Sequence, residues 1–462
     1  MSVLTGAAAL FLFGTGVFYI VYLRGTGLFR PAACVRALRT PGRAGGKSRS
    51  IPPLSGLLMA LAGTLGVGNI VGVASALRLG GPGSVFWMIV SGLTVSVLKY
   101  AEIVLAVRHR RTSPDGHRFG GAPYYIGDLT ASRGHERAGR ALGLAFVALC
   151  LVNALTMGSV LQINAAAGAM RGAFGVPPLA TGITVAAVTA VLLAGGSRRI
   201  ASLTEKLVPL MTGVFLVLCA AVLILRRDRL PAAAASVLRE AFSLRSAGTG
   251  VFGFTCIRAM RIGTVRGLVS NEAGSGTAPM AHAAADTDSP AAQGLLGVAE
   301  VLVDTVLLCT VTAFTVLVSD SGWTAFGDDG ANCARCAFTS VLGAWAGGAF
   351  AVCVLLFAAA TVFCWAHYGR TCADYMAVTI RPGISPKGQG NVRLAYAVLA
   401  CASLVLGSTA APGLCWTLAD GAVYLMTMLN LCFLLIGRRE VKDETGRLFT
   451  ETRRGRPDDT LY

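Results

Sequence analysis

Long apolar runs, separated by short polar segments, set the pattern of this chain. A run of about 20 apolar residues is long enough to cross a bilayer core of about 30 Å as a helix. A further apolar segment opens the region 246–285, so we expect roughly eleven spans in all. The ten clearest runs cover residues 5–23, 54–78, 84–107, 141–170, 179–194, 206–225, 292–318, 345–367, 394–411 and 416–436. The pattern predicts an all-α integral membrane protein.

The run at 54–80 contains four glycines within ten residues, at positions 63, 66, 68 and 72. Each glycine weakens a helix by up to about 1 kcal/mol relative to alanine. Opened backbone at membrane depth is tolerated only where it lines a protein cavity. Its carbonyls suit a small cation and its amides suit a carboxylate, and Asn69 can both donate and accept. Tight helix packing is the alternative explanation, but we favour a substrate and cation site in a broken helix.

The region 246–285 is the second unusual one, because glycines precede a polar, Gly-rich run at 266–279. We expect a cytoplasmic re-entrant turn or short helix packed under the site. Two loosened helices at corresponding places in two halves are typical of inverted-repeat transporters. The predicted organisation is a first helix (1–24), a basic cytoplasmic loop (25–50), two halves (51–230 and 231–437) and a polar cytoplasmic tail (438–462).

Several predicted spans carry polar or aromatic residues. Asp304 lies inside 292–318, and an intramembrane carboxylate needs a partner or a cation, which makes it a functional candidate. Lys99 and Glu102 lie near the inner end of 84–107, where we expect the lysine to extend to the membrane interface. Thr361 and Trp365 are one helical turn apart and share a face. Trp365 is either an interfacial anchor or a pocket residue.

Composition and charge support the membrane assignment. The 462 residues are 54% hydrophobic and 14% charged, against about 25% charged in soluble domains. The net charge of +17 is concentrated in short loops beside apolar spans, which argues for orientation in the membrane rather than nucleic-acid binding. Seven basic and no acidic residues at 24–50 predict an inner-membrane protein with its N-terminus outside and its C-terminus in the cytoplasm. The basic segment 226–245 is the exception, because it falls on the outside.

The thirteen cysteines are mostly isolated within apolar spans, so no disulfide framework is indicated. Cys333 and Cys336 form the one close pair. A metal or redox role for the pair is the less favoured alternative, because no second pair or nearby histidine supports it.

Five groups of segments resemble the alanine or glycine:cation symporters, the sodium:alanine symporter family. They are Gly-Val-Gly-Asn-Ile-Val-Gly-Val-Ala at 66–74, Gly-Gly-Pro-Gly at 80–83 with Lys-Tyr-Ala-Glu at 99–102, Thr-Glu-Lys-Leu-Val-Pro at 204–209, Arg-Gly-Leu at 266–268 with Ser-Asn-Glu-Ala-Gly at 270–274, and Trp365 with Tyr-Gly at 368–369. The resemblance implies two inverted five-helix repeats plus an N-terminal helix, and inward symport of small neutral amino acids with Na⁺. No other cofactor is implied.

The resemblance also implies roles for individual residues. Substrate contacts are expected at Gly66, Gly68, Asn69, Gln162, Thr361 and Trp365, with Trp365 limiting substrate size. Sodium ligands or their supports are expected at Thr64, Asn69, Thr255 and Asp304.

Arg258 departs from the family, which usually has an uncharged side chain near the pocket at this position. Burying an arginine near the bilayer centre costs about 2.5–3.5 kcal/mol, so we expect Asp304 or a substrate carboxylate to pair with it. One rival function is therefore a carrier for an amino acid with a second carboxylate. Another is a non-transporting amino-acid sensor or a channel. An enzyme is disfavoured, because no nucleophile–base pair, phosphate loop or metal cluster is evident.

Overall fold

The computed structural model describes residues 2–24, 51–112, 118–242, 251–324, 330–411 and 413–454, so the predicted basic loop at 25–50 lies entirely outside the described residues. The described chain is almost entirely helical, which confirms the predicted fold class. The first half contains α1 (Ser2–Tyr22), α3 (Pro53–Thr64), α4 (Val71–Gly80), α5 (Gly83–Arg108), α6 (Ala122–Ala131), α7 (Glu136–Leu155), α8 (Leu161–Phe174), α9 (Pro178–Gly195) and α10 (Ser197–Leu225). The second half contains α11 (Leu230–Phe242), α12 (Val251–Asn271), α13 (Pro279–Ala283), α14 (Pro290–Val301), α15 (Thr310–Val318), α16 (Gly330–Leu342), α17 (Trp345–Ile380), α18 (Pro386–Gly407) and α19 (Gly413–Arg454).

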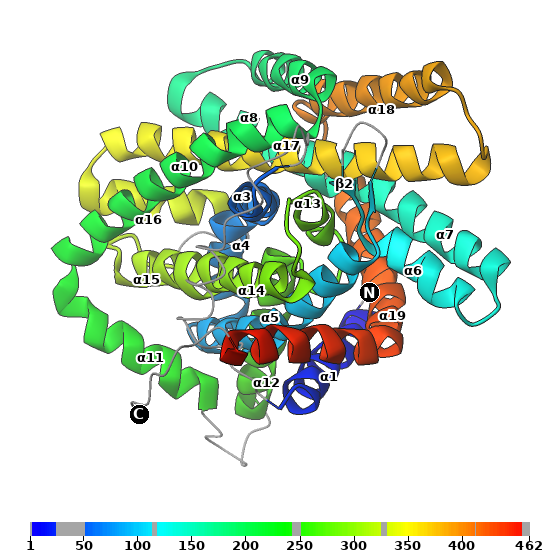
Figure 1. Cartoon of the computed structure of the whole chain (residues 1–462). Coiled ribbons are helices and arrows are strands. Elements are labelled where there is room, and N and C mark those ends of the chain that lie inside the picture. The colour runs from blue at the N-terminus through cyan, green and yellow to red at the C-terminus, as the bar shows by residue number, and fades with distance from the viewer. Residues whose placement is uncertain are drawn as a thin grey trace.

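Eight helices, counted over the described residues, are each long and apolar enough to cross a membrane. The short apolar helices α3 and α4 lie in line with them, and the count of eleven spans stays a prediction. Short α3 and α13 lie near the middle of the bundle, with α5, α14, α10 and α17 around them (Figure 1). A small hairpin of β1 (Arg111–Thr112) and β2 (Arg118–Phe119) lies at one end, where Arg111 pairs with Phe119.

The first glycine-rich segment is a broken helix, as the sequence predicts. Helix α3 ends at Thr64, Gly66 is extended at φ −108° and ψ −167°, and a single 3₁₀ turn covers Val67–Asn69 before α4 begins. The break is buried, apart from Gly68. Glycine permits this interruption because it adds no Cβ where neighbouring side chains approach the backbone.

The second loosened segment is also a broken helix inside the bundle. Helix α12 ends at Asn271, and Glu272 (φ +52°), Gly274 (+85°) and Gly276 (+80°) turn the chain before α13. Every residue from 270 to 285 is buried. The expected short helix is present as α13, and seven non-helical residues precede it within the protein core, where surrounding side chains satisfy their polar groups. Its position on the cytoplasmic side stays a prediction.

Two further irregularities bring polar residues inward. A π-helical turn at Thr156–Val160 joins α7 to α8, and another at Leu302–Cys309 joins α14 to α15. Such turns insert an extra residue into the helix and are frequent at functional sites. The first precedes Gln162, and the second contains Asp304.

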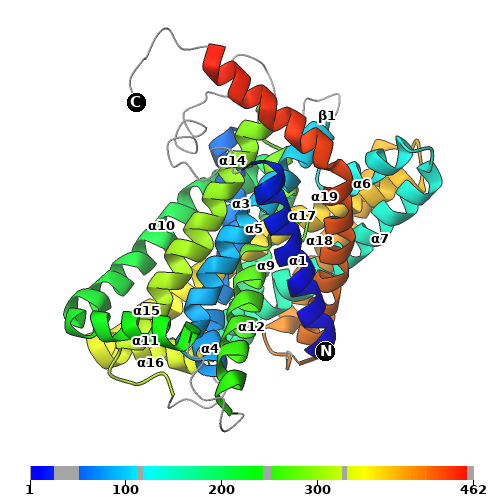
Figure 2. The ribbon, with the colours of Figure 1, turned by 90° about the horizontal axis from the view of Figure 1, so that it is seen from below.

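The predicted polar tail is helical as far as Arg454, because α19 continues beyond the apolar run. Figure 2 shows the final part of α19 running across one end of the bundle. Arg108 at the end of α5 donates to Glu440 (2.8 Å) and Glu444 (2.5 Å) of α19. The next residue, His109, contacts Glu440 (2.9 Å) and Asp128 (3.0 Å) through its two ring nitrogens. Burial alone would lower the pKa of His109, but these two carboxylates outweigh burial and raise it above its ordinary value.

The basic segment 226–245, which the sequence places outside, pairs with an acidic residue. Arg226 and Arg229 both pair with Asp320, which follows α15. Asp320 partly neutralises these two arginines, so they contribute less to the orientation of the protein in the membrane.

Candidate functional site

The backbone of the first break meets two side chains from other helices. Gln162 of α8 accepts through Oε1 from the amide of Val67 (3.2 Å) and donates to the carbonyl of Met157 (3.3 Å). Thr361 of α17 donates to the carbonyls of Phe357 (3.0 Å) and Leu65 (3.4 Å). A Cβ at position 66 would lie 2.9 Å from Thr361 Oγ1 and 3.1 Å from Gln162 Oε1. Any larger residue there would displace Thr361 or Gln162.

Asn69 and Asp304 form the centre of a buried polar cluster. Asn69 Nδ2 donates to Asp304 Oδ1 at 2.5 Å. Ser270 and Thr305 donate to the other carboxylate oxygen at 2.9 and 2.8 Å. All four residues are at most 8% exposed. The cluster joins both breaks to the π turn, because its members come from the 3₁₀ turn, from the last turn of α12 and from Leu302–Cys309.

The side-chain oxygen of Asn69 is the unpaired polar atom of this cluster. Asn69 Oδ1 is buried and has no hydrogen-bond partner among the described residues. When Asp304 is ionised, the orientation that turns Nδ2 toward its carboxylate is the one that makes a hydrogen bond. A buried amide oxygen left unpaired costs about 1–3 kcal/mol, and oxygen is the ligand type that hard cations take.

Gly68 marks an open space beside the cluster. It is exposed, whereas Val67 and Asn69 on either side are buried. A Cβ on Gly68 would meet no atom within 4 Å, and its φ lies outside the left-handed region. The first break therefore presents main chain to a space that the protein does not fill.

The second break holds the indole of Trp365. Trp365 Nε1 donates to Glu272 Oε1 (3.2 Å), and Thr277 donates to Glu272 Oε2 (2.7 Å). Gly158 lies against the ring, where a Cβ would approach Trp365 to 2.4 Å. Trp365 is 1% exposed, so it belongs to the protein interior and the interfacial-anchor alternative is wrong.

A network of buried polar side chains connects the short helices α3 and α13 to α5 and α14. Lys99 of α5 pairs with Glu300 of α14 at 3.2 Å, and Glu300 accepts from His282 of α13 at 3.1 Å. The amide of Gln293 donates to the other ring nitrogen of His282 (2.8 Å) and to the carbonyl of Pro53 in α3 (3.3 Å). Lys99 and Glu300 are fully buried. The expectation that Lys99 extends to the interface is wrong, because an internal carboxylate compensates its charge.

Glu102, one turn after Lys99, supports the second break directly. Its carboxylate accepts from the amide of Gly276 (2.8 Å) and from Asn430 of α19 (2.5 Å). Asn430 also donates to the carbonyl of Gly274 (2.9 Å) and accepts from Tyr125. The unwound main chain is thereby satisfied by side chains instead of by helical hydrogen bonds.

These features agree with a comparison against protein families, in which the model of the sodium:alanine symporter family matches residues 2–460. The chain belongs to the sodium:alanine symporter family. Membership makes it a multi-pass membrane protein and a Na⁺-coupled amino-acid symporter rather than an enzyme.

Curated relatives align over most of their length. The sodium/alanine symporter AgcS of Methanococcus maripaludis is 34% identical over 402 residues, covering 86% of this chain and 84% of the relative. A probable sodium/glutamine symporter, GlnT of Bacillus subtilis, is 32% identical and covers 87% and 79%. An uncharacterized transporter of Haemophilus influenzae is 34% identical and covers 88% and 85%.

Two solved structures share the fold. A Na⁺-coupled sialic acid symporter in a substrate-bound, outward-open state has a TM-score of 0.58 at 11% identity, covering 99% of both chains. MhsT in complex with L-phenylalanine has a TM-score of 0.56 at 13% identity, covering 87% of this chain and 93% of that one. At these identities the likeness shows the fold alone.

The structure brings together most of the predicted site residues. Gly66 meets Gln162 and Thr361, and Asn69 meets Asp304. Thr64 is not part of either group, because its hydroxyl bonds the carbonyls of Ala60 and Leu61 in its own helix.

Arg258 does not lie in the site. Its side chain is exposed, and it precedes Ser270 by twelve residues, or about 18 Å along α12. The predicted burial of Arg258 and its pairing with Asp304 are therefore wrong. The side chain of Thr255, four residues into the same helix, lies outside the described residues.

Sequence reasoning missed Ser270, Glu272, Glu300 and His282 as members of the buried networks. Glu272 lies in the segment 270–274 that resembles the family. Its polar side chain in that segment was the available signal. The pair Cys333 and Cys336 are both free thiols, and no group of three or more metal-binding side chains occurs among the residues described.

Proposed function

We propose that the protein carries small neutral amino acids, alanine and glycine, into the cell together with Na⁺. The observation that supports this most strongly is the broken helix, where exposed main chain at Gly68 adjoins the buried Asn69–Asp304 cluster. Main-chain dipoles and a carboxylate within one break suit a zwitterion and a small cation together.

Sodium is assigned to the cluster of Asn69, Ser270 and Asp304. Asn69 supplies its unpaired amide oxygen, Asp304 supplies the charge and Ser270 supplies a hydroxyl. A bound cation compensates the cost of a carboxylate held in the interior, which is otherwise several kcal/mol.

The substrate is assigned to the open space at Gly68, with its carboxylate on the main-chain amides of the break. Gln162 and Thr361 hold that main chain in place, so they act as positioning residues for the carboxylate. Trp365 closes the volume on the side of the second break. The name of the archaeal relative supports alanine, and the name of the Bacillus subtilis relative makes glutamine the competing substrate.

Transport proceeds by alternating access, in which one helix bundle moves against another around a site near the bilayer midplane. One Na⁺ moving through 100 mV supplies about 2.3 kcal/mol, enough for roughly 50-fold accumulation of a zwitterion. The excess of basic residues at 24–50 supports a position in the cytoplasmic membrane with the N-terminus outside and the C-terminus inside.

Uptake into proteoliposomes tests the proposal. Labelled alanine should accumulate when Na⁺ is outside and should not when K⁺ replaces it, and glycine should compete better than glutamine. Asn69→Ala should abolish accumulation while the protein still inserts and purifies. Accumulation that ignores both Na⁺ and this substitution would reject symport at this site, and binding without accumulation would favour the sensor or channel.

The carrier for a dicarboxylic amino acid loses its structural basis, because Arg258 is exposed and distant from the break. Aspartate and glutamate should therefore not compete.

A further inference from the structure

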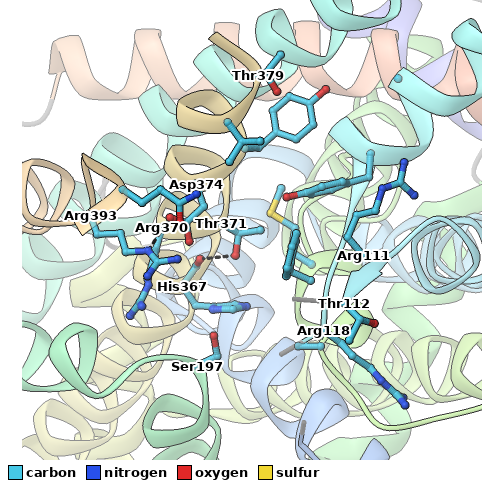
Figure 3. A pocket seen from close by; sticks show the side chains of 18 of the residues that line it. Arg111, Thr112, Arg118, Ser197, His367, Arg370, Thr371, Asp374, Thr379 and Arg393 are labelled. Carbon is cyan, nitrogen blue, oxygen red and sulfur yellow. Dashed lines mark hydrogen bonds and ion pairs between the residues drawn. The ribbon is translucent and has the colours of Figure 1, made fainter. Parts of the chain in front are cut away.

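A second polar cavity lies apart from the side-chain clusters at the two breaks. Its volume is about 1040 Å³, and it is bounded by the second half of α17, the start of α18, α6 and the β1–β2 hairpin (Figure 3). None of the residues that line it belongs to the clusters at the two breaks. It opens at the end of the bundle that the basic loops assign to the cytoplasm.

Five arginines line this cavity, and four of them have a carboxylate partner. The pairs are Arg111–Asp128 (2.6 Å), Arg118–Asp286 (2.6 Å), Arg140–Glu136 (2.6 Å) and Arg393–Asp374 (2.7 Å). Arg370 is the fifth. Within the described part of the chain, its one hydrogen-bond partner is the main-chain carbonyl of Leu193, at 2.6 Å.

The neighbours of Arg370 compensate its charge only in part. Asp374 follows it by one helical turn and lies on the same face of α17, but Arg393 donates to that carboxylate. Two guanidinium groups therefore flank one carboxylate, with a net charge of +1. Figure 3 shows Arg370, Arg393 and Asp374 on one wall, with Arg111 and Arg118 on the opposite wall. A guanidinium with free donors in a water-accessible cavity matches the geometry of a carboxylate.

Two helices, α13 and α17, border both the cavity and the second break. Arg370 follows Trp365 by five residues, or about 7.5 Å along α17. Met280 lines the cavity from α13 and follows Thr277, a partner of Glu272, by three residues. Along α17, the Arg370 wall therefore lies less than two helical turns from Trp365.

We propose that Arg370 and Asp374 form a second, release-side station for the transported amino acid. The carboxylate of the amino acid contacts Arg370, and its ammonium contacts Asp374. This station rests on the proposed function, because its ligand is the transported zwitterion. Arg370 also bonds the last turn of α9, so a purely structural role is the competing explanation.

Transport from each side separates the two roles. Half-saturation for alanine is measured in right-side-out and inside-out membrane vesicles carrying the wild type, Arg370→Gln or Arg381→Gln. Arg381 is an exposed arginine just after α17 that does not line the cavity, so it serves as the matched control. We expect Arg370→Gln to raise the inner half-saturation about tenfold, the scale of one charge-assisted contact, and to leave the outer value unchanged. Arg381→Gln should change neither.

A rise of equal size on both sides, or an unchanged inner value, overturns the station and leaves Arg370 as a helix cap. Asp374→Asn provides a second route if Arg370→Gln does not fold, and it should weaken the inner side alone. Absence of Na⁺-driven alanine transport in the wild type rejects the proposed function, and the station falls with it. Normal wild-type transport with side-independent variants rejects the station alone.

Discussion

Two glycines of the first break, two residues apart, should respond in opposite ways to an added methyl group. At position 66 a Cβ would lie 2.9 Å from Thr361 Oγ1, 3.1 Å from Gln162 Oε1 and 3.3 Å from Gln162 Nε2. At position 68 it would meet nothing within 4 Å. Gly66→Ala thus strains the packing of the protein, and Gly68→Ala occupies the space we assign to the substrate.

The sizes of the two effects follow from these distances. Overpacking of the kind expected at Gly66 costs about 1–3 kcal/mol, and moving Gln162 aside also breaks its bonds to Val67 and Met157. Gly68 has no strained φ, so alanine there should be neutral or stabilise by about 0.4–1 kcal/mol. In a tight pocket, one methyl group is worth about 1–3 kcal/mol, or 10–200-fold in discrimination.

Thermal unfolding and competitive uptake together test this pair. Gly66→Ala should melt below the wild type, and Gly68→Ala should melt at or above it. Gly68→Ala should nonetheless lose alanine uptake, with its preference for glycine over alanine rising at least about tenfold. Unchanged selectivity in a stable Gly68→Ala protein would show that the space beside Gly68 is not the substrate site.

Three further changes test the supporting structure. Lys99→Met should destabilise the purified protein by about 3–5 kcal/mol, because it leaves Glu300 buried without a cation; adding Glu300→Gln should recover much of the loss, and a double variant no more stable than the single one would refute the pairing. The raised pKa of His109 stabilises the fold below about pH 6.5. That contribution is lost as pH rises through the folded-state pKa, so the wild type should lose more thermal stability than His109→Gln across this range, and parallel pH profiles would contradict it. Trp365→Phe removes the donor to Glu272 and some ring volume, so larger amino acids such as glutamine should compete better, and an unaltered substrate range would argue against a size limit at this position.

The sequence predicted the first break because four glycines within ten residues weaken a helix and are not expected in a plain lipid-facing span. It also predicted that Asn69 and Asp304 are functional, since polar groups at membrane depth need partners. Their meeting depends on tertiary packing of the 3₁₀ turn against a π turn, and no local pattern specifies a π turn. Ser270 was overlooked because its partner, Asp304, lies on a segment distant in sequence.

The errors concern where along a helix a residue falls relative to the membrane. Lys99 lies near the end of an apolar run, where extension to the interface is the commoner outcome, and only Glu300 of a distant helix makes burial possible. Arg258 follows apolar residues, but α12 extends thirteen residues beyond it to Asn271, which carries the break away from the arginine. Hydropathy locates a span, whereas the depth of each residue depends on where the helix ends.

Equilibrium binding to the purified protein tests the central claim most directly, namely that one broken helix holds the amino acid and Na⁺ together. Alanine affinity is measured over a series of Na⁺ concentrations, and Na⁺ affinity over a series of alanine concentrations, for the wild type and Asp304→Asn. The account predicts that each ligand strengthens the other by the same factor, as linkage requires, and that Asp304→Asn removes this mutual effect. Alanine affinity that is independent of Na⁺ in the wild type, or coupling that survives intact in Asp304→Asn, would contradict it.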